Sequence, residues 1–378
     1  MILKNATVMD ESFCLRKCDL QIENGKISAV ADVLYSDNAV DLSGCLILPG
    51  FIDSHLHGAM GCKISDAAPE LHKITQYEAT QGVTSIAIST VCSDYHHLLA
   101  QIDMAVEAAA VKAGAKIAAI HAEGPFINPA KKGAMDEKFI LLPDCEKLDE
   151  MIDHAKGLLR LITLAPEMEG SLDFITHAVS RGLTVSMGHT TATYEQAQAA
   201  IRAGATQTTH TFNAMRPYSH REPGILGAAL TDPAVRCEMI CDHTHLHPAV
   251  MKLIWQMKGA DGINIISDSE YGAGLDVPEV MVDGQLHYIR DGVMVLEDGT
   301  IAGSASSMLY GIQNLIKDGI PLEDISRMAS INPAKTLKID HETGSIAVGK
   351  AADLVVLNKD YDVLYTYVDG ECVYRKEH

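Results

Sequence analysis

The feature that most constrains the fold is a series of short apolar segments that recur through the middle of the chain. They are residues 47–53, 84–89, 117–121, 159–165, 183–188, 206–211, 237–241 and 263–267. Amphipathic stretches typical of helices, such as residues 195–202, separate most of these segments. Strands that alternate with helices in this number predict an α/β fold with a parallel (β/α)8 TIM-like barrel. Residues 277–303 break the alternation with Asp-Gly turns, and they predict a hairpin insertion followed by a loop at the catalytic face.

The two ends of the chain follow a different pattern, in which short apolar runs are interrupted by turn residues. Asn24-Gly25 lies between two such runs and marks a hairpin. The last residues of the chain show the same style. We therefore expect residues 1–48 and 341–378 to pair into one small β-sandwich domain, with the barrel at residues 49–340.

Composition excludes several classes of partner. Acidic residues outnumber basic residues 50 to 30, which gives a net charge of −20, so nucleic acid and anionic membranes are not expected to bind. The nine cysteines form no paired C-x-x-C spacing, which argues against a disulfide framework or a cysteine zinc site. Neither a signal peptide nor an apolar run of roughly 18 residues is found. We therefore expect a cytoplasmic protein.

Polar side chains end several of the apolar segments, where a barrel of this kind forms its active site. His55 and His57 follow the first segment, and their spacing on an extended chain places both imidazoles on one face, where they can bind one metal. Glu123, His189 and His210 each end a different predicted strand. Such side chains converge on the barrel axis and leave a coordination position open for water. The sequence therefore predicts a site for a divalent metal.

Asp268 ends the last predicted strand and is the candidate catalytic residue. Its carboxylate would take a proton from metal-activated water and return it to a leaving nitrogen, whereas the alternative is a buried carboxylate that caps a helix. His243, His245 and His247 form a second alternating set that could also bind metal. We do not assign this set as ligands, because the first set already supplies a complete site.

Motifs at both ends of the barrel region resemble those of the amidohydrolase superfamily. They are Leu-Pro-Gly-Phe-Ile-Asp-Ser-His-Leu-His-Gly at residues 48–58, Asn-Pro-Ala-Lys at residues 332–335, and the glycine-containing segments at 344–346 and 349–355. Interior motifs narrow the resemblance to the amino-sugar phosphate deacetylases of that superfamily. These motifs lie at residues 121–127, 131–134, 188–190, 210–215 and 221–224. The resemblance extends essentially from end to end of the chain.

The resemblance implies an enzyme that hydrolyses the N-acetyl amide of N-acetylglucosamine 6-phosphate to glucosamine 6-phosphate and acetate, with Asp268 as general base and acid. It implies that a metal ion, zinc or iron in the first place, is held by Glu123, His189 and His210. It also implies that His55 and His57 permit a second ion, bridged by Glu123. One or two ions per subunit are thus expected.

The resemblance further implies which residues contact the sugar phosphate. They are Asn213, the backbone of Ala214, Arg221 and His245. Arg221 would reach into the site of a neighbouring subunit, so a homodimer is expected. This chain departs from the family pattern at Met135, where a histidine is usual, at residues 269–271, and at His243.

Two alternatives to this activity remain open. The same chemistry could act on N-acetylgalactosamine 6-phosphate or on another N-acyl amide, because the departures lie at the substrate pocket. A more remote alternative is a non-catalytic protein that binds a sugar phosphate on the same barrel.

Overall fold

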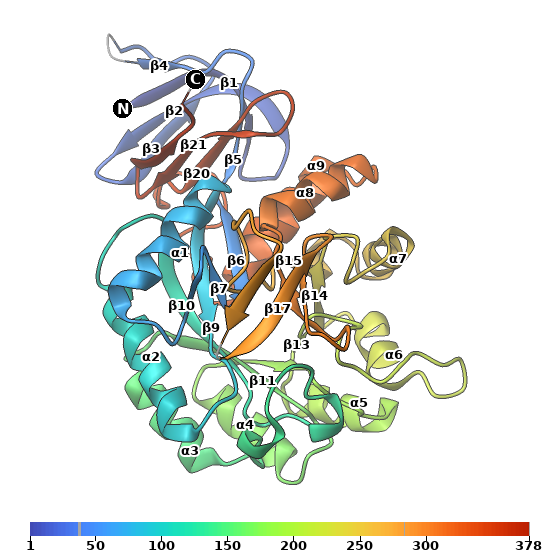
Figure 1. Cartoon of the computed structure of the whole chain (residues 1–378). Helices are drawn as coiled ribbons and strands as arrows, with labels where there is room; N and C mark the ends of the chain where they lie inside the picture. Colours follow the sequence, from blue (N-terminus) through green and yellow to red (C-terminus); the bar gives the residue numbers. More distant parts are fainter. Residues whose placement is uncertain (37–38, 283, 378) are drawn as a thin grey trace.

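An eight-stranded parallel sheet forms the centre of the computed structural model, which describes residues 1–36, 39–282 and 284–377 (Figure 1). Its strands, in the order in which they neighbour one another, are β6 (Phe51–Leu56), β9 (Val83–Ser89), β10 (Lys116–Glu123), β11 (Leu159–Leu164), β12 (Thr184–Met187), β13 (Gln207–Thr208), β14 (Arg236–Ile240) and β15 (Ile263–Ile266). β15 also contacts β6, and this contact brings the two edges together. The predicted (β/α)8 barrel is therefore confirmed.

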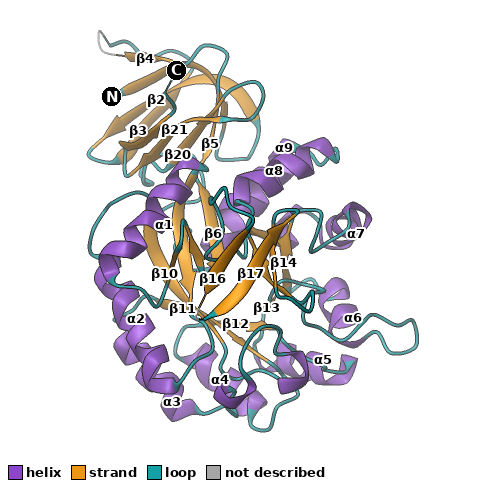
Figure 2. Ribbon diagram, viewed as in Figure 1, coloured by secondary structure: helices purple, strands orange, loops and turns teal. Residues whose placement is uncertain are grey.

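Helices surround the barrel strands (Figure 2). They are α1 (Ala68–Thr80), α2 (Tyr95–Ala109), α3 (Cys145–His154), α4 (Ser171–Ser180), α5 (Tyr194–Ala203), α6 (Gly224–Thr231), α7 (Pro248–Lys258), α8 (Met308–Lys317), α9 (Leu322–Ser326) and α10 (Asn332–Thr336), with short 3-10 turns at residues 129–131, 137–139 and 260–262 and a π turn at 327–331. Local sequence sets the ends of α5. Thr193 and Gln196 form a capping box at its start, and Gly204 ends it with φ of 116°. Within the described residues, no helix is both long and apolar enough to cross a membrane.

Strands from both ends of the chain form a second sheet beside the barrel. These strands are β1 (Ile2–Met9), β2 (Leu15–Glu23), β3 (Lys26–Ala31), β4 (Ala39–Asp41), β5 (Leu46–Pro49), β20 (Leu354–Leu357), β21 (Val363–Val368) and β22 (Glu371–Arg375). The order is β22-β21-β20-β5-β1-β2-β3, and β4 pairs with β1. β5 and β20 pair antiparallel and so join the two ends. The predicted hairpin at Asn24-Gly25 is present, with the positive φ angles of 50° and 77° that this turn requires.

Between β15 and α8 the chain forms a small antiparallel sheet. Its strands are β16 (Glu279–Val282), β17 (Gln285–Arg290), β18 (Val293–Val295) and β19 (Ile301–Ser304). The predicted hairpin insertion corresponds to β16 and β17, whereas the segment predicted as a loop contains two further strands. A shorter hairpin, β7 (Gly58–Ala59) with β8 (Cys62–Lys63), follows β6.

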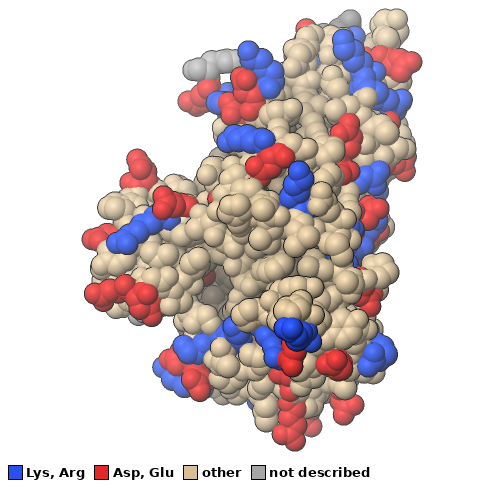
Figure 3. Space-filling model, turned by 90° about the vertical axis from the view of Figure 1, so that its right-hand side faces the viewer, with Lys and Arg blue, Asp and Glu red and all other residues tan. Residues whose placement is uncertain are grey.

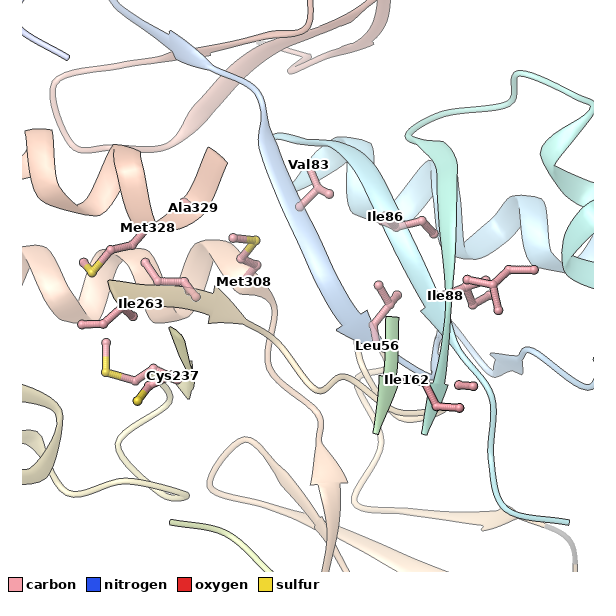
Figure 4. Packing of buried hydrophobic residues seen from close by; sticks show 14 of the residues in the cluster. Leu56, Val83, Ile86, Ile88, Ile162, Cys237, Ile263, Met308, Met328 and Ala329 are labelled. Atoms are coloured by element: carbon pink, nitrogen blue, oxygen red, sulfur yellow. The ribbon is translucent and has the colours of Figure 1, made fainter. Parts of the chain in front are cut away.

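Apolar side chains fill the space between the barrel strands and the helices. Figure 4 shows this packing with Leu56, Ile86 and Ile162 on barrel strands and Met308 and Met328 on the helical segments. A separate cluster consists of Ile52, Ala87, Ala119 and Leu161 on four strands with Ala334, Leu337 and Ile339 from the end of the barrel region. These two cores hold the strands in place, so the residues at the strand ends are positioned by a packed scaffold.

Candidate metal centre

Six of the residues singled out in the sequence lie at the carboxyl ends of barrel strands. His55 lies in β6 and Glu123 is the last residue of β10. The other four, His57, His189, His210 and Asp268, follow the ends of β6, β12, β13 and β15 within two residues. All six are buried, with at most 9% of any residue exposed.

Three of these residues form a first group of potential ligands. Nε2 of His55 lies 3.3 Å from Nε2 of His57. Oδ1 of Asp268 lies 3.4 Å from Nε2 of His55 and 3.5 Å from Nε2 of His57. We refer to His55, His57 and Asp268 as subsite 1.

Glu123, His189 and His210 form a second group, which we call subsite 2. Oε1 of Glu123 lies 3.2 Å from Nε2 of His189 and 3.1 Å from Nε2 of His210. The two imidazole nitrogens lie 3.0 Å from each other. The ligand atoms of each subsite all lie within 4.8 Å of one another.

Glu123 borders both subsites. Its Oε1 lies 3.4 Å from Nε2 of His55, and its Oε2 lies 3.2 Å from Nε2 of His57. One carboxylate thus faces four imidazoles, and it is placed to contact an ion in either subsite.

The donor set fits a divalent cation. Nitrogen and oxygen donors that lie about 2.0–2.1 Å from a tetrahedral ion are about 3.3 Å apart from one another. The donor atoms described above are separated by 3.0 to 3.5 Å. Imidazole and carboxylate ligands suit zinc, iron, manganese and cobalt alike, so the geometry indicates a divalent metal site of this general type.

Charge at the site also favours a cation. Burial opposes ionisation of Glu123, but the imidazoles of His55, His189 and His210 outweigh it and hold the pKa of this carboxyl well below its ordinary value. The pKa of Asp268 is likewise lowered, because His55 and His57 outweigh the effect of burial. In turn, Asp268 and Glu123 overcome burial and raise the pKa of His57 to about 10. The pocket therefore stabilises positive charge at this point.

Three of the six residues have left-handed backbone conformations. φ is 47° at His189, 29° at His210 and 50° at Asp268. Such conformations cost a non-glycine residue about 1–3 kcal/mol and cluster at functional sites. At Asp268 the conformation is held on both sides, because its N–H donates to the carbonyl of His55 at 3.0 Å and its carbonyl accepts from the N–H of Ser304 at 2.8 Å.

Hydrogen-bonded groups beneath and beside the ligands were not predicted as site residues. His121 packs against His55 with ring centroids 4.5 Å apart, and it lies 2.9 Å from Ser89 Oγ and 2.8 Å from Thr163 Oγ1. Glu238 lies 3.0 Å from Nδ1 of His55. The signal for Glu238 was its position as a charged residue inside the apolar segment 237–241, because a buried charge needs a partner.

The residues predicted to contact substrate lie in the loops that follow β13 and β14. Asn213 is half-buried, and its Nδ2 has no hydrogen-bond partner among the described residues. The carbonyl of Ala214 accepts from the N–H of Thr190 at 3.1 Å. The side chain of His245 is buried, with Nδ1 2.6 Å from Oδ2 of Asp242. Arg221 is exposed on the loop that precedes α6.

The alternating histidines at 243–247 have other partners. Nε2 of His243 lies 2.9 Å from Asp318, and His247 caps α7 by accepting from the N–H of Ala249. Across the described parts of the chain, the two subsites are the only groups of three or more side chains arranged to hold a metal ion.

Two further departures from the family pattern lie in the segments after β15 and β10. The backbone around Ser269 pairs with Ser304 of β19, and Glu270 donates its N–H to the carbonyl of Ser304 at 2.8 Å. Burial raises the pKa of Glu270 to about 7, against the lowering effect of His57. Met135 lies in the loop after β10, where its carbonyl accepts from Nζ of Lys132 at 3.1 Å.

Comparison with known proteins gives extensive similarity. The profile of the Amidohydrolase family matches residues 46–373. The N-acetylglucosamine-6-phosphate deacetylase of Vibrio furnissii is 34% identical over 357 residues, covering 93% of this chain and 89% of the relative. The N-acetylgalactosamine-6-phosphate deacetylase of Escherichia coli O157:H7 is 32% identical over 375 residues, covering 98% of each.

A solved structure is similar along the whole chain. It is a mutant of the N-acetyl-D-glucosamine-6-phosphate deacetylase of Mycobacterium smegmatis in complex with N-acetyl-D-glucosamine-6-phosphate, and it is 32% identical with a TM-score of 0.92. The match covers 99% of both chains. The barrel, the small β sheet and their connections are therefore shared with that protein.

Proposed function

Because the chain belongs to the amidohydrolase family, we propose that it is a metal-dependent deacetylase that hydrolyses the N-acetyl amide of N-acetylglucosamine 6-phosphate. The products are glucosamine 6-phosphate and acetate. The observation that carries this proposal is the pair of buried donor groups that share Glu123, in a chain that resembles such deacetylases over nearly its full length.

We assign the metal ligands by subsite. Glu123, His189 and His210 hold the catalytic ion, and His55 and His57 with Glu123 hold a second ion when two are bound. Zinc or iron is the proposed metal, because the ligands are imidazoles and carboxylates. When bound, the metal polarises the amide carbonyl and lowers the pKa of a water molecule towards neutrality.

Asp268 moves the proton in this proposal. Its carboxylate accepts a proton as the water oxygen bonds to the carbonyl carbon, and it donates that proton to the nitrogen as the C–N bond breaks. The lowered pKa keeps the carboxyl in its ionised form. Its backbone, hydrogen-bonded to His55 and Ser304, keeps it over the ligands.

The substrate is held by Asn213, the backbone of Ala214, Arg221 and His245. Nδ2 of Asn213 is a buried donor without a hydrogen-bond partner in the described part of the chain, so a hydroxyl or carbonyl oxygen of the substrate would satisfy it. Asp242 fixes Nδ1 of His245, which leaves Nε2 for an anionic group. Figure 3 shows a hollow among mostly uncharged residues, with Lys and Arg side chains below it.

We further propose a homodimer in which Arg221 completes the site of the neighbouring subunit. The exposed position of Arg221 on the loop before α6 supports this arrangement. Residues 1–48 with 341–378 are proposed as one domain and residues 49–340 as the other.

We propose a cytoplasmic location. The nine free cysteines support a reducing compartment.

A second substrate is favoured by one specific finding. A relative named for N-acetylgalactosamine 6-phosphate is about as similar to this chain as those named for the glucosamine epimer. Glu270 and Tyr271 replace the small residues usual in the family beside Asp268, and we propose that this replacement affects the choice between the epimers.

The proposal is tested by acetate release from N-acetylglucosamine 6-phosphate and its galactosamine epimer in parallel, with metal content measured on the same preparation. Turnover of the first substrate with a higher kcat/KM is the expected result. Preference for the second would transfer the assignment to the epimer. Metal-loaded protein that releases no acetate from either would refute both sugar-phosphate substrates and point to another N-acyl amide. A binding protein is favoured only if the chain binds the sugar phosphates without hydrolysing any such amide.

A further inference from the structure

A buried glutamate that is not itself placed to bind metal lies directly behind one of the ligands. Glu238 occupies the middle of β14, and none of its surface is exposed. Burying a carboxylate is costly unless hydrogen bonds compensate for lost solvation. Its neighbours in the strand, Cys237 and Met239, belong to the hydrophobic core. Successive side chains of a strand point to opposite faces, so Glu238 points to the other face of β14, where it meets His55 and His210.

Both oxygens of Glu238 have partners. Oε2 lies 3.0 Å from Nδ1 of His55 and accepts from the backbone N–H of His210 at 3.0 Å. Oε1 accepts from Nε2 of Gln207 at 2.7 Å. Gln207 cannot turn its amide freely, because its own oxygen accepts from Asn264 at 2.9 Å and from Thr336 at 3.0 Å. The carboxylate is therefore fixed in position and in orientation.

This arrangement determines the form of His55. A carboxylate can only accept, so Nδ1 carries a proton and donates it to Glu238. Nε2 is then the nitrogen that offers a lone pair, and it faces Glu123 and Asp268, each at 3.4 Å. By contrast, Nδ1 of His57 and Nδ1 of His210 have no partner among the described residues. Within subsite 1, only His55 is held by a buried acceptor.

The same oxygen also reaches subsite 2. His210 stands in the left-handed conformation, and its N–H is held by Oε2 of Glu238. The backbone carbonyl of Glu238 accepts from the N–H of the next residue, Thr211, at 3.0 Å. Glu238 therefore contacts a ligand of each subsite from behind.

We propose that Glu238 is a positioning residue of the metal centre, which sets the tautomer of His55 and holds the backbone of His210, so that both subsites depend on one buried carboxylate. This inference rests on the metal-binding part of the proposed function but not on the identity of the substrate. Partners of this kind behind metal-binding histidines typically contribute about 10- to 100-fold to metal affinity.

The test compares metal affinity in the length-matched variant Glu238→Met with that in Gln207→Met. The first removes the acceptor behind His55, whereas the second breaks the same buried network but leaves that acceptor in place. His55→Ala supplies the reference for complete loss of this ligand. We expect zinc affinity to fall about 10- to 100-fold in Glu238→Met, towards the value of His55→Ala, and to change less than about threefold in Gln207→Met.

A second readout does not depend on affinity. In zinc-loaded wild-type protein labelled with 15N-histidine, we expect a slowly exchanging Nδ1–H signal for His55. We expect this signal to be lost in Glu238→Met, or in Glu238→Leu if the methionine variant fails to fold, because neither side chain offers an acceptor to Nδ1. Equal loss of zinc in Glu238→Met and Gln207→Met, or an Nε2–H signal for His55, would overturn the inference. Failure of the wild type to release acetate would instead count against the proposed function alone.

Discussion

Oδ1 of Asp268 lies 3.4 Å from Nε2 of His55. This distance is about the same as the distance between two donor atoms that bind one metal ion, although Asp268 is the proposed proton carrier and His55 a proposed ligand. In the proposed function, the carboxylate would therefore lie beside the water that takes part in the reaction. This closeness also raises the alternative that Asp268 serves only as a ligand.

Replacing Asp268 by asparagine separates these roles. We expect Asp268→Asn to lose about 100- to 10,000-fold in kcat, because general acid–base catalysis contributes about that much. Metal content should stay near that of the wild type, since Glu123, His189 and His210 are intact. Acetate release and metal analysis on the same sample provide the measurement, and Asp261→Asn, at an exposed site, is the control. Near wild-type turnover with metal loaded would show that the proton is moved by another group.

Acetate release should depend on bound metal, and substitutions of different ligands should lower the metal content to different extents. Chelation is expected to abolish acetate release, and added zinc should restore it. Glu123 borders both subsites, so Glu123→Gln should lose metal at both, whereas His57→Ala should affect only subsite 1. Metal titration monitored by elemental analysis after dialysis distinguishes these variants. Equal metal loss in the two variants would contradict the division into subsites.

The proposed role of Arg221 in the neighbouring subunit predicts complementation. Arg221→Ala alone should lower kcat/KM about 100-fold, or roughly 2.7 kcal/mol. When Arg221→Ala and Asp268→Asn chains are co-expressed, a hybrid dimer has one site with both residues intact. Random pairing should then restore about one quarter of wild-type activity. If Arg221 acts within its own chain, no hybrid site is complete and activity stays at the level of the separate variants.

The buried side chain of Glu78 should make the free energy of unfolding depend on pH. It lies in α1, fully buried, and both of its side-chain oxygens lack hydrogen-bond partners among the described residues. Burial and the nearby Asp53 raise its pKa well above the ordinary value. The folded chain therefore keeps a proton that the unfolded chain loses above about pH 4.3, so the free energy of unfolding falls as pH rises from there through the folded-state pKa.

Glu78→Gln removes this titration. We expect the variant to be more stable than the wild type by about 1–3 kcal/mol at pH 8, with the difference shrinking towards zero near pH 4.5. Urea unfolding across this range gives the measurement. Glu107→Gln in α2 is the control, because Glu107 is exposed. A gain that did not vary with pH would show that the carboxyl is not the source.

Much of the barrel was predictable because each strand is short, apolar and flanked by helix-forming sequence. Each of the eight segments contains a strand, and the ligands occur where those segments end. The segment at 47–53 differs in detail. It divides into β5 and β6, since Gly50 allows a close approach in which an added Cβ would lie 2.2 Å from Thr84, and its two halves join different sheets.

The network behind the ligands was less accessible from sequence. Glu238 is separated from His55 by 183 residues, and local pattern gives no register between β14 and β6. The strands β18 and β19 were missed because residues 291–304 contain turn residues and little alternation. Their pairing with the segment after Asp268 depends on long-range contacts. Tertiary pairing, rather than local propensity, decided these features.

The pairing of β5 with β20 has a consequence for synthesis of the chain on the ribosome. Leu48 pairs with Val355, so the partner of β5 is made roughly 300 residues later, which at about 5–20 residues per second is a delay of about 15–60 s. During that time the edge of β5 offers unpaired backbone groups to any other strand. The N-terminal strands are therefore exposed to mispairing and aggregation until the C-terminal strands have been synthesised. Co-translational chaperones would be needed most at this edge.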